Sequence, residues 1–282
     1  MIAANAVGII FNPESSRAGG LIAALKSILS LDEDTWIVPA YSDQYPEIPE
    51  GIALIITLGG DGTILWSTQI AAPREIPILG INLGRVGFMT EIEPDEVRDK
   101  ISLYLEDNTW VEERSMLQIT VNSSGPDKLE AAFHVLNEVV IGRNTITRLV
   151  NLDVQVDDID FMSYRADALI VATATGSTGY ALSAGGPLIH PESTDIITVP
   201  VAPHMNMGRA MVLPSRSKID ISVVSAPGAV ASLDGRIDIS LEPDQVITVL
   251  KSPYSARFLR SRDQGRFYEM VNRKLKVNTD SF

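Results

Sequence analysis

Cysteine is absent from this chain of 282 residues. The absence excludes disulfide bonds, thiolate metal sites and a cysteine nucleophile, so stability has to come from packing and from contacts between subunits. Long apolar runs are missing as well, because no stretch approaches the ~20 residues that span a membrane. Residues 1–5 carry no basic segment and lead directly into an apolar run. We therefore expect a cytoplasmic protein without a cleaved signal peptide.

Positive charge is also scarce, with 23 Lys and Arg against 36 Asp and Glu and a net charge of −13. Such a chain repels nucleic acid and anionic membranes, so we expect it to bind neither. Any bound phosphate must then be held by local groups and a metal ion. Residues 251–282 are the exception, with eight Lys and Arg against three Asp and Glu. This basic tail either docks on the acidic remainder or forms a solvated face.

The two common phosphate-binding motifs are missing, since there is neither GxxxxGK[ST] nor a GxGxxG that opens a helix. The sequence has LGGDGT at 58–63 instead, between the apolar run 52–58 and helical spacing over 64–72. Glycines let the backbone approach a polyphosphate, and a helix N-terminus offers unpaired N–H groups. A carboxylate such as Asp61 cannot bind phosphate, but it can accept a proton from an attacking hydroxyl or hold a metal. A plain connecting turn is the alternative.

Apolar runs and helical spacing alternate in the first part of the chain. They predict, in order, a strand at 6–11, a helix around 21–29, strands at 36–38 and 53–58, a helix after Asp61 and a strand at 76–81. The order β-α-β-β-α-β favours an open parallel sheet. Ligands of such sheets bind at the carboxyl ends of strands, where the Asp61 turn lies. Helical spacing recurs over 94–108.

After Trp110 the pattern changes to short β-rich runs separated by turn residues. We expect strands at 116–121, 133–141, 149–156, 159–164, 168–174, 196–201, 219–224 and 246–250. The predicted fold is therefore an α/β domain followed by an all-β, sandwich-like domain. Apolar residues at helical spacing over 267–275 predict a terminal helix that returns to the first domain. The expected domains are residues 1–107 with 256–282, and residues 108–255.

Polar residues interrupt the β-rich part at two places. Asn137 and Glu138 lie side by side in a strand pattern, where alternation leaves room for only one polar residue. The pair suits a purine edge or a ribose diol, although a β-bulge or sheet edge would also explain it. The run 173–187, TATGSTGYALSAGGP, combines glycines, hydroxyls and a tyrosine, which indicates a dinucleotide site or an ordinary loop. Asp167 and Asp234 are two further candidate carboxylates.

Together these residues resemble the NAD kinase family over nearly the whole chain. The resemblance is carried by 58–63, 80–88, Asn137 with Glu138, Asp167 with 175–187, Pro203-His204 with Leu213-Pro214, and Asp234-Gly235. The glycine-aspartate motif alone is shared with diacylglycerol, sphingosine and phosphofructokinase-type kinases, whereas the Asn-Glu pair and the TGSTGY run are specific to NAD kinases. The resemblance implies transfer of the γ-phosphate of ATP, or of inorganic polyphosphate, to the 2′-hydroxyl of the adenosine ribose of NAD, giving NADP.

The resemblance also implies a role for each site residue. Asp61 is expected to be the catalytic base, and Gly59, Gly60, Gly62 and Thr63 the donor-nucleotide loop. The residues expected to bind NAD are Phe88, Asn137, Glu138, Asp167, Thr175, Thr178, Gly179, Tyr180, Ser183 and Asp234. No metal site is expected in the chain itself, because Mg²⁺ would arrive with ATP. Family members are homodimers or homotetramers whose pockets are shared between subunits.

Two departures from the family pattern leave the choice between NAD and NADH open. Ala168 stands where the family usually has glycine, and Gly179 stands where alanine is common. A diacylglycerol-type lipid kinase and a non-enzymatic dinucleotide sensor are the alternative functions. The acidic surface opposes the first of these, and the intact Asp61 opposes the second.

Overall fold

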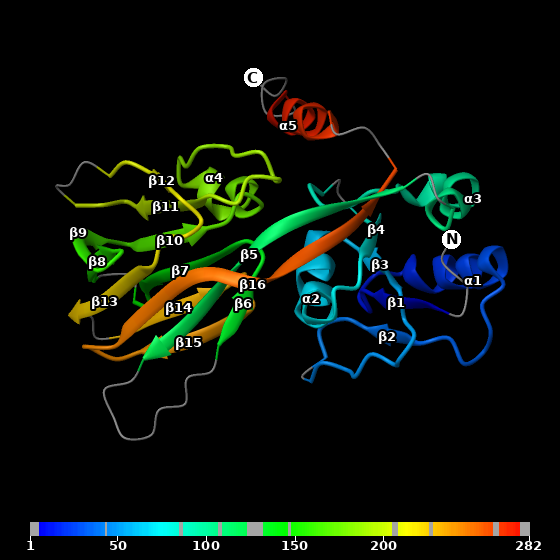
Figure 1. The fold of residues 1–282 in the computed structure, drawn as a ribbon, viewed down its shortest axis with the longest axis horizontal. Coiled ribbons are helices and arrows are strands. Elements are labelled where there is room, and N and C mark those ends of the chain that lie inside the picture. The colour runs from blue at the N-terminus through cyan, green and yellow to red at the C-terminus, as the bar shows by residue number, and fades with distance from the viewer. Residues whose placement is uncertain are drawn as a thin grey trace. The chain divides into compact units, whose positions relative to one another are not determined.

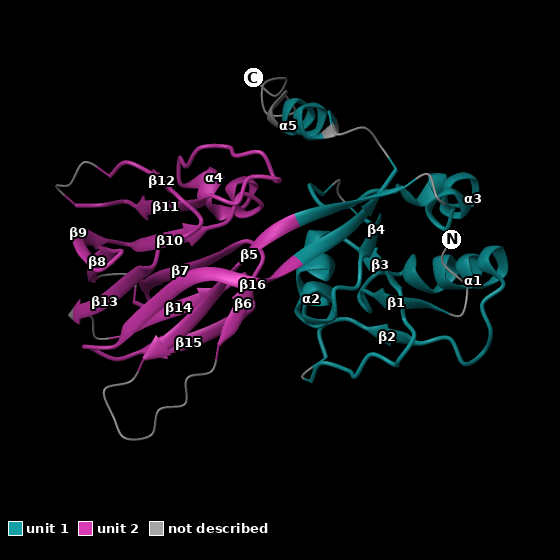
Figure 2. Ribbon diagram, viewed as in Figure 1, with its two compact units in different colours: residues 1–113, 256–282 teal, residues 114–255 magenta. Residues whose placement is uncertain are grey.

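The computed structural model describes residues 6–42, 44–84, 87–106, 109–122, 132–145, 148–204, 208–225, 228–261 and 265–276. The chain divides into two compact units, which are residues 1–113 with 256–282, and residues 114–255 (Figure 2). It passes between them in two strands, β5 (Trp110–Asn122) and β16 (Val246–Arg260). None of the described helices has the length and apolar composition needed to cross a membrane.

The first unit contains a parallel sheet in the strand order β2-β1-β3-β4 (Figure 1). Its strands are β1 (Val7–Phe11), β2 (Ile37–Pro39), β3 (Leu54–Gly59) and β4 (Ile78–Asn82). Helix α1 (Ala18–Leu29) leads from β1 to the edge strand β2, and α2 (Asp61–Ala71) leads from β3 to β4 in the other direction. The topological switch point therefore lies between β1 and β3, and α2 begins at the carboxyl end of β3.

Two helical predictions of the first unit are corrected in their bounds. Helix α2 begins at Asp61, three residues before the predicted start, because Gly60 is extended and its carbonyl oxygen accepts bonds from Thr63 and Ile64 N–H. The helix predicted over 94–108 is broken into η3 (Pro94–Glu96), α3 (Val97–Lys100) and η4 (Ile101–Tyr104).

Two further helices belong to the first unit. The 3₁₀ helix η2 (Ala72–Arg74) follows α2, and α5 (Arg266–Lys276) is the terminal helix.

The second unit is built from antiparallel strands in two sheets, as predicted for a sandwich-like domain. One sheet has the order β12-β11-β10-β7-β14-β15, and the other contains β13, β8 and β9 with β5, β6 and the beginning of β16. The bounds are β6 Phe133–Val135, β7 Glu138–Arg143, β8 Val150–Val156, β9 Ile159–Ala166, β10 Ala168–Ala172, β11 Ile196–Val201, β12 Met211–Leu213, β13 Ile219–Ser225, β14 Ala229–Leu233 and β15 Ile237–Leu241. Buried side chains from both sheets form one apolar core.

The strand predicted over 133–141 is in fact two strands. β6 pairs with β5, whereas β7 pairs with β10 and β14 of the other sheet. The chain thus changes sheets at Leu136 and Asn137, which explains why polar residues interrupt the apolar pattern there. Strands β12, β14 and β15, the 3₁₀ helix η5 (Gly176–Thr178) and the short helix α4 (Tyr180–Ser183) were not predicted, because their apolar runs are short or interrupted by polar residues.

Candidate active site

The carboxylate of Asp61 is held by the backbone of a neighbouring loop. Phe88 N–H donates to Oδ2 at 2.9 Å, and Met89 N–H donates to Oδ1 at 3.0 Å. A Cβ at position 87 would lie 2.1 Å from Oδ1, so only glycine fits there. Asp61 is half-buried at the first position of α2. In the sequence this loop falls within residues 80–88, one of the stretches that carry the family resemblance.

The glycines of the predicted donor loop have different surroundings. A Cβ at Gly59 would lie 2.1 Å from the buried Thr63 hydroxyl, so this glycine allows the tight turn. Apart from its chain neighbours, no described atom lies within 4 Å of the Cβ position of Gly60, so this side of the turn is open to a ligand. Tyr41 was not predicted, yet its hydroxyl lies 3.1 Å from that of Thr63 and 3.2 Å from the Cβ position of Gly62.

A buried charge network holds the loop that binds Asp61. Arg260, the last residue of β16, donates through Nη1 to Met89 O at 2.9 Å and to Glu91 at 3.3 Å. Its Nε donates to Glu112 at 2.7 Å, and the Tyr104 hydroxyl donates to Glu91 at 3.0 Å. Since Met89 N–H in turn donates to Asp61, this network orients the carboxylate. No local sequence pattern indicates this network, because its members are far apart in the chain.

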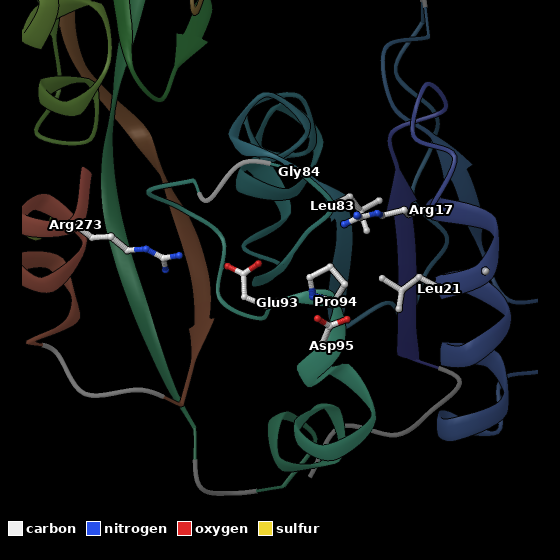
Figure 3. Close-up of a pocket in the computed structure, with 9 residues that line it drawn as sticks. Arg17, Leu21, Leu83, Gly84, Glu93, Pro94, Asp95 and Arg273 are labelled. Atoms are coloured by element: carbon white, nitrogen blue, oxygen red, sulfur yellow. The ribbon is translucent and has the colours of Figure 1, made fainter. Parts of the chain in front are cut away.

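Helix α5 brings two cations to this part of the first unit. Lys274 Nζ lies 3.9 Å from the centroid of the Phe88 ring. Burial lowers the pKa of Lys274, and the negative charge of Asp61 opposes that shift. Arg273 lines a cavity of about 580 Å³ together with Arg17 and the carboxylates of Glu93 and Asp95 (Figure 3).

In the second unit, three predicted residues present polar atoms that are buried and unpaired. They are Asn137 Oδ1, Glu138 Oε2 and Thr175 Oγ1, which have no hydrogen-bond partner among the described residues. Burial raises the pKa of Glu138 to about 7, with a further contribution from the charge of Asp234. The Tyr180 N–H opposes this shift by donating to the carboxylate. Buried polar groups are normally paired, so such a cluster indicates a ligand site.

Asp234 organises this cluster from a turn. Its backbone is left-handed, with φ of 49°, and its carboxylate accepts the N–H groups of Leu136, Asn137 and Glu138 at 2.9, 2.8 and 3.0 Å. Burial raises the pKa of Asp234 to about 6 against the effect of these three bonds. The carboxylate thus fixes the segment where the chain changes sheets. Its predicted contact with NAD stays a prediction.

The TGSTGY run packs closely against the same segment. A Cβ at Gly176 would lie 2.3 Å from Asn137 O, and a Cβ at Gly179 would lie 3.1 Å from Glu138 Oε2. The Thr173 hydroxyl donates to Leu136 O at 2.6 Å, and the Thr178 hydroxyl donates to Thr175 O at 3.0 Å. The two glycines therefore bring the run against Glu138. Further along, Tyr180 and Ser183 are exposed.

Asp167 lies apart from this cluster. Its two carboxylate oxygens pair with Arg143 Nε and Nη2, each at 3.0 Å. It precedes β10, whose other end, Ala172, pairs with Glu138. At about 3.4 Å per residue, the five steps from Asp167 to Ala172 correspond to roughly 17 Å. The structure thus brings Asn137, Glu138, Thr175 and Gly179 together and places Asp167 at the opposite end of the strand.

Comparisons with known proteins identify the family of this chain. The model of the ATP-NAD kinase N-terminal domain matches residues 33–109, and that of the C-terminal domain matches residues 136–261. The NAD kinase of Dehalococcoides mccartyi strain CBDB1 is 37% identical over 98% of this chain and 97% of its own length. The chain belongs to the ATP-NAD kinase family. The NAD kinase of Chloroflexus aurantiacus strain J-10-fl is 36% identical over 96% of this chain and 98% of its own.

Two solved structures have the same fold. The NAD kinase from Archaeoglobus fulgidus in complex with ATP superposes with a TM-score of 0.73 at 27% identity, and covers 94% of this chain and 97% of its own. Yeast NADH kinase complexed with NADH gives a TM-score of 0.82 at 24% identity, and covers 98% and 88%. The predicted combination of a parallel α/β domain and an antiparallel β domain is confirmed.

A resident metal has no evident site in the described parts of the chain. There, no group of three His, Asp or Glu side chains is arranged to hold an ion. Asp61 is a single carboxylate beside the glycine turn, and its oxygens already accept two N–H groups. The carboxylate oxygens of Asp61 fit an ion whose remaining ligands come from nucleotide phosphates and water.

Proposed function

We propose which residues of this NAD kinase family member carry out the phosphorylation of NAD to NADP with ATP. Asp61 is the general base, the turn 59–63 binds the donor phosphates, and the cluster of Asn137, Glu138 and Thr175 binds the adenosine half of NAD. The observation that carries the proposal is the cluster of three buried polar atoms without partners. A carboxylate, an amide and a hydroxyl can together donate to and accept from a ribose diol and a purine edge.

The chemical step follows from the position of Asp61. The 2′-oxygen of the adenosine ribose attacks the γ-phosphorus, and its proton passes to a carboxylate oxygen of Asp61. The bond from the γ-phosphorus to the bridging oxygen breaks, and ADP leaves with the electron pair. Two backbone N–H groups orient the carboxylate, yet each oxygen keeps a lone pair for the proton. Mg²⁺ bound to ATP would neutralise charge on the β- and γ-phosphates.

One assay tests the function directly. The purified chain is incubated with Mg²⁺-ATP and NAD, with diacylglycerol instead of NAD, or with neither, and NADP is followed with an NADP-specific dehydrogenase. We expect NADP only when NAD is present. Binding of NAD without NADP formation would favour the dinucleotide sensor, and a phosphorylated lipid would favour the lipid kinase. Replacing ATP by inorganic polyphosphate decides the range of donors.

Mg²⁺ is proposed to bind with the nucleotide rather than in a protein site of its own. Chelation should abolish activity, whereas calorimetry of the protein without nucleotide should show only weak Mg²⁺ binding. Micromolar Mg²⁺ affinity in the absence of ATP would contradict this assignment.

We further propose a homodimer or homotetramer in which the pocket is shared. Asp167 lies at the far end of β10 from Glu138, and Tyr180 is 45% exposed, so both are accessible to an NAD molecule that is bound mainly by another subunit. Mixing Asp61→Asn protein with Asp167→Ala protein, both inactive alone, should restore activity after subunit exchange. Mixed oligomers without recovery would contradict the sharing. The predicted contacts of Phe88, Thr178 and Ser183 with NAD, and the cytoplasmic location, stay predictions.

A further inference from the structure

Asp61 gives the donor turn a charge of the wrong sign for a phosphate. The turn itself, Gly59 to Thr63, contains no lysine or arginine, unlike a P-loop with its phosphate-binding lysine. Transfer of a phosphoryl group places further negative charge beside the carboxylate, and such sites use cations to stabilise it. A positive side chain from elsewhere in the chain would meet this need.

Lys274 is close to the Asp61 carboxylate through Phe88. Its ammonium lies 3.9 Å from the Phe88 ring centroid, and the backbone N–H of Phe88 donates to Asp61 Oδ2 at 2.9 Å. Within the described part of the chain, Lys274 has no carboxylate in ion-pair contact. A ring face attracts an ammonium without using up its N–H donors. The three donors of Lys274 thus remain available to an incoming anion.

The electrostatic surroundings agree with this arrangement. Partial burial lowers the pKa of Lys274, and the negative charge of Asp61 acts in the opposite direction. Arg273, the preceding residue, lines the cavity beside Leu83 and Gly84, which follow the carboxyl end of β4 (Figure 3). Two consecutive cations of α5 therefore reach the carboxyl edge of the same parallel sheet.

We propose that Lys274 binds the terminal phosphate of the donor at the Asp61 turn and offsets the charge that develops there during transfer. The inference rests on the proposed function, because the turn is taken as the donor site. The ligand chemistry is that of a phosphoanhydride, which ATP and inorganic polyphosphate share. Helix α5, which has four Lys and Arg against one Glu, would thus supply the cation that the glycine turn lacks.

The test compares Lys274→Met and Lys274→Arg with Lys251→Met, which removes an exposed lysine of β16 in the second unit. For Lys274→Met we expect kcat/KM for ATP to fall by about 10²–10³-fold, the usual effect of losing one group that stabilises transition-state charge. NAD affinity and Tm should stay at the wild-type values. Lys274→Arg should recover most of the loss, and Lys251→Met should match the wild type.

Inorganic tripolyphosphate and adenosine, titrated separately by calorimetry, identify the part of the donor that Lys274 contacts. The Met variant should lose at least 10-fold in affinity for tripolyphosphate and nothing for adenosine. Unchanged tripolyphosphate affinity of the Lys274→Met variant would overturn the inference. A variant that also loses Tm and NAD affinity would overturn it in favour of a packing role for α5. A wild-type protein that forms no NADP would refute the proposed function instead, and the tripolyphosphate titration would still decide the role of Lys274.

Discussion

Asp61 in the first unit and Glu138 in the second are site carboxylates that are held in opposite ways. In the parallel unit, both oxygens of Asp61 accept backbone N–H groups from one loop. In the antiparallel unit, Glu138 has a buried oxygen with no partner among the described residues, and burial raises its pKa to about 7. The two backbone bonds fix the orientation of the Asp61 carboxylate, whereas the unpaired oxygen of Glu138 can still accept a hydrogen bond from a ligand.

The difference follows from where each carboxylate lies in its sheet. Asp61 lies at the switch point of a parallel sheet, where a helix begins and N–H groups converge. Glu138 lies where the chain leaves one antiparallel sheet for another, and Asp234 takes the N–H groups of that crossing. The N–H groups of residues 136–138 are thus used by Asp234, and Glu138 accepts a backbone bond from Tyr180 instead. Substitutions of the two carboxylates and of the residues around Asp61 test this comparison.

The largest effect is expected from Asp61→Asn. The amide keeps the shape of the side chain but cannot accept the proton, so kcat should fall about 10²–10⁴-fold, which is about 3–5 kcal/mol of barrier. NAD affinity should change little, because the adenosine cluster belongs to the other unit. Steady-state kinetics and NAD titration measure the two effects. The exposed Asp34→Asn is the control, and an Asp61→Asn protein with near wild-type kcat would refute the base assignment.

Gly87→Ala should have the next largest effect. The new methyl group would lie 2.1 Å from Asp61 Oδ1 and must displace the carboxylate. A misplacement of about 1 Å typically costs about 10²-fold in rate, so kcat should fall by that factor although Asp61 is still present. Gly19→Ala in α1 is the matched control, because no described atom lies within 4 Å of its Cβ position. Equal activities of the two variants would show that the loop does not orient Asp61.

Much of this fold was accessible from the sequence. The succession of strands and helices along the first unit and the position of Asp61 follow from apolar runs and one glycine motif, which are local signals. Gly87, Arg260 and Lys274 were not found, because their roles depend on contacts between residues far apart in the chain. The role of Asp234 in holding residues 136–138 was missed for the same reason. Local patterns predict elements, whereas the support of a site depends on tertiary contacts.

Glu138→Gln should change stability with pH and weaken NAD binding. In the wild type the folded-state pKa is raised from 4.5 to about 7, so this group favours folding below pH 4.5 and loses that contribution as the pH rises to 7. Glutamine does not ionise, so the variant should gain about 1–3 kcal/mol in unfolding free energy relative to the wild type at pH 8, and nothing near pH 4.5. Urea unfolding at both pH values measures the difference.

The control for this variant is the exposed Glu50→Gln, which should unfold like the wild type at both pH values. Asp234, whose pKa is raised to about 6, is present in both proteins, and its contribution largely cancels in the comparison. The affinity for NAD should fall about 10-fold, since a hydrogen bond to a charged group contributes about 1.5 kcal/mol. A stability gain that is the same at both pH values would mean that the carboxyl group is not desolvated.

The smallest effect is expected from Tyr41→Phe, which probes the donor turn without touching Asp61. The variant removes the hydroxyl 3.1 Å from that of the buried Thr63. Losing one such hydrogen bond costs about 0.5–1.5 kcal/mol, so we expect that loss in unfolding free energy and at most about a 10-fold rise in KM for ATP. NAD affinity should not change. Thr63→Val and the double variant complete a cycle, because the two single effects should not add if the hydroxyls act as a pair. Additive effects would show instead that Tyr41 supports the turn only by packing over Gly62, where its hydroxyl lies 3.2 Å from the Cβ position.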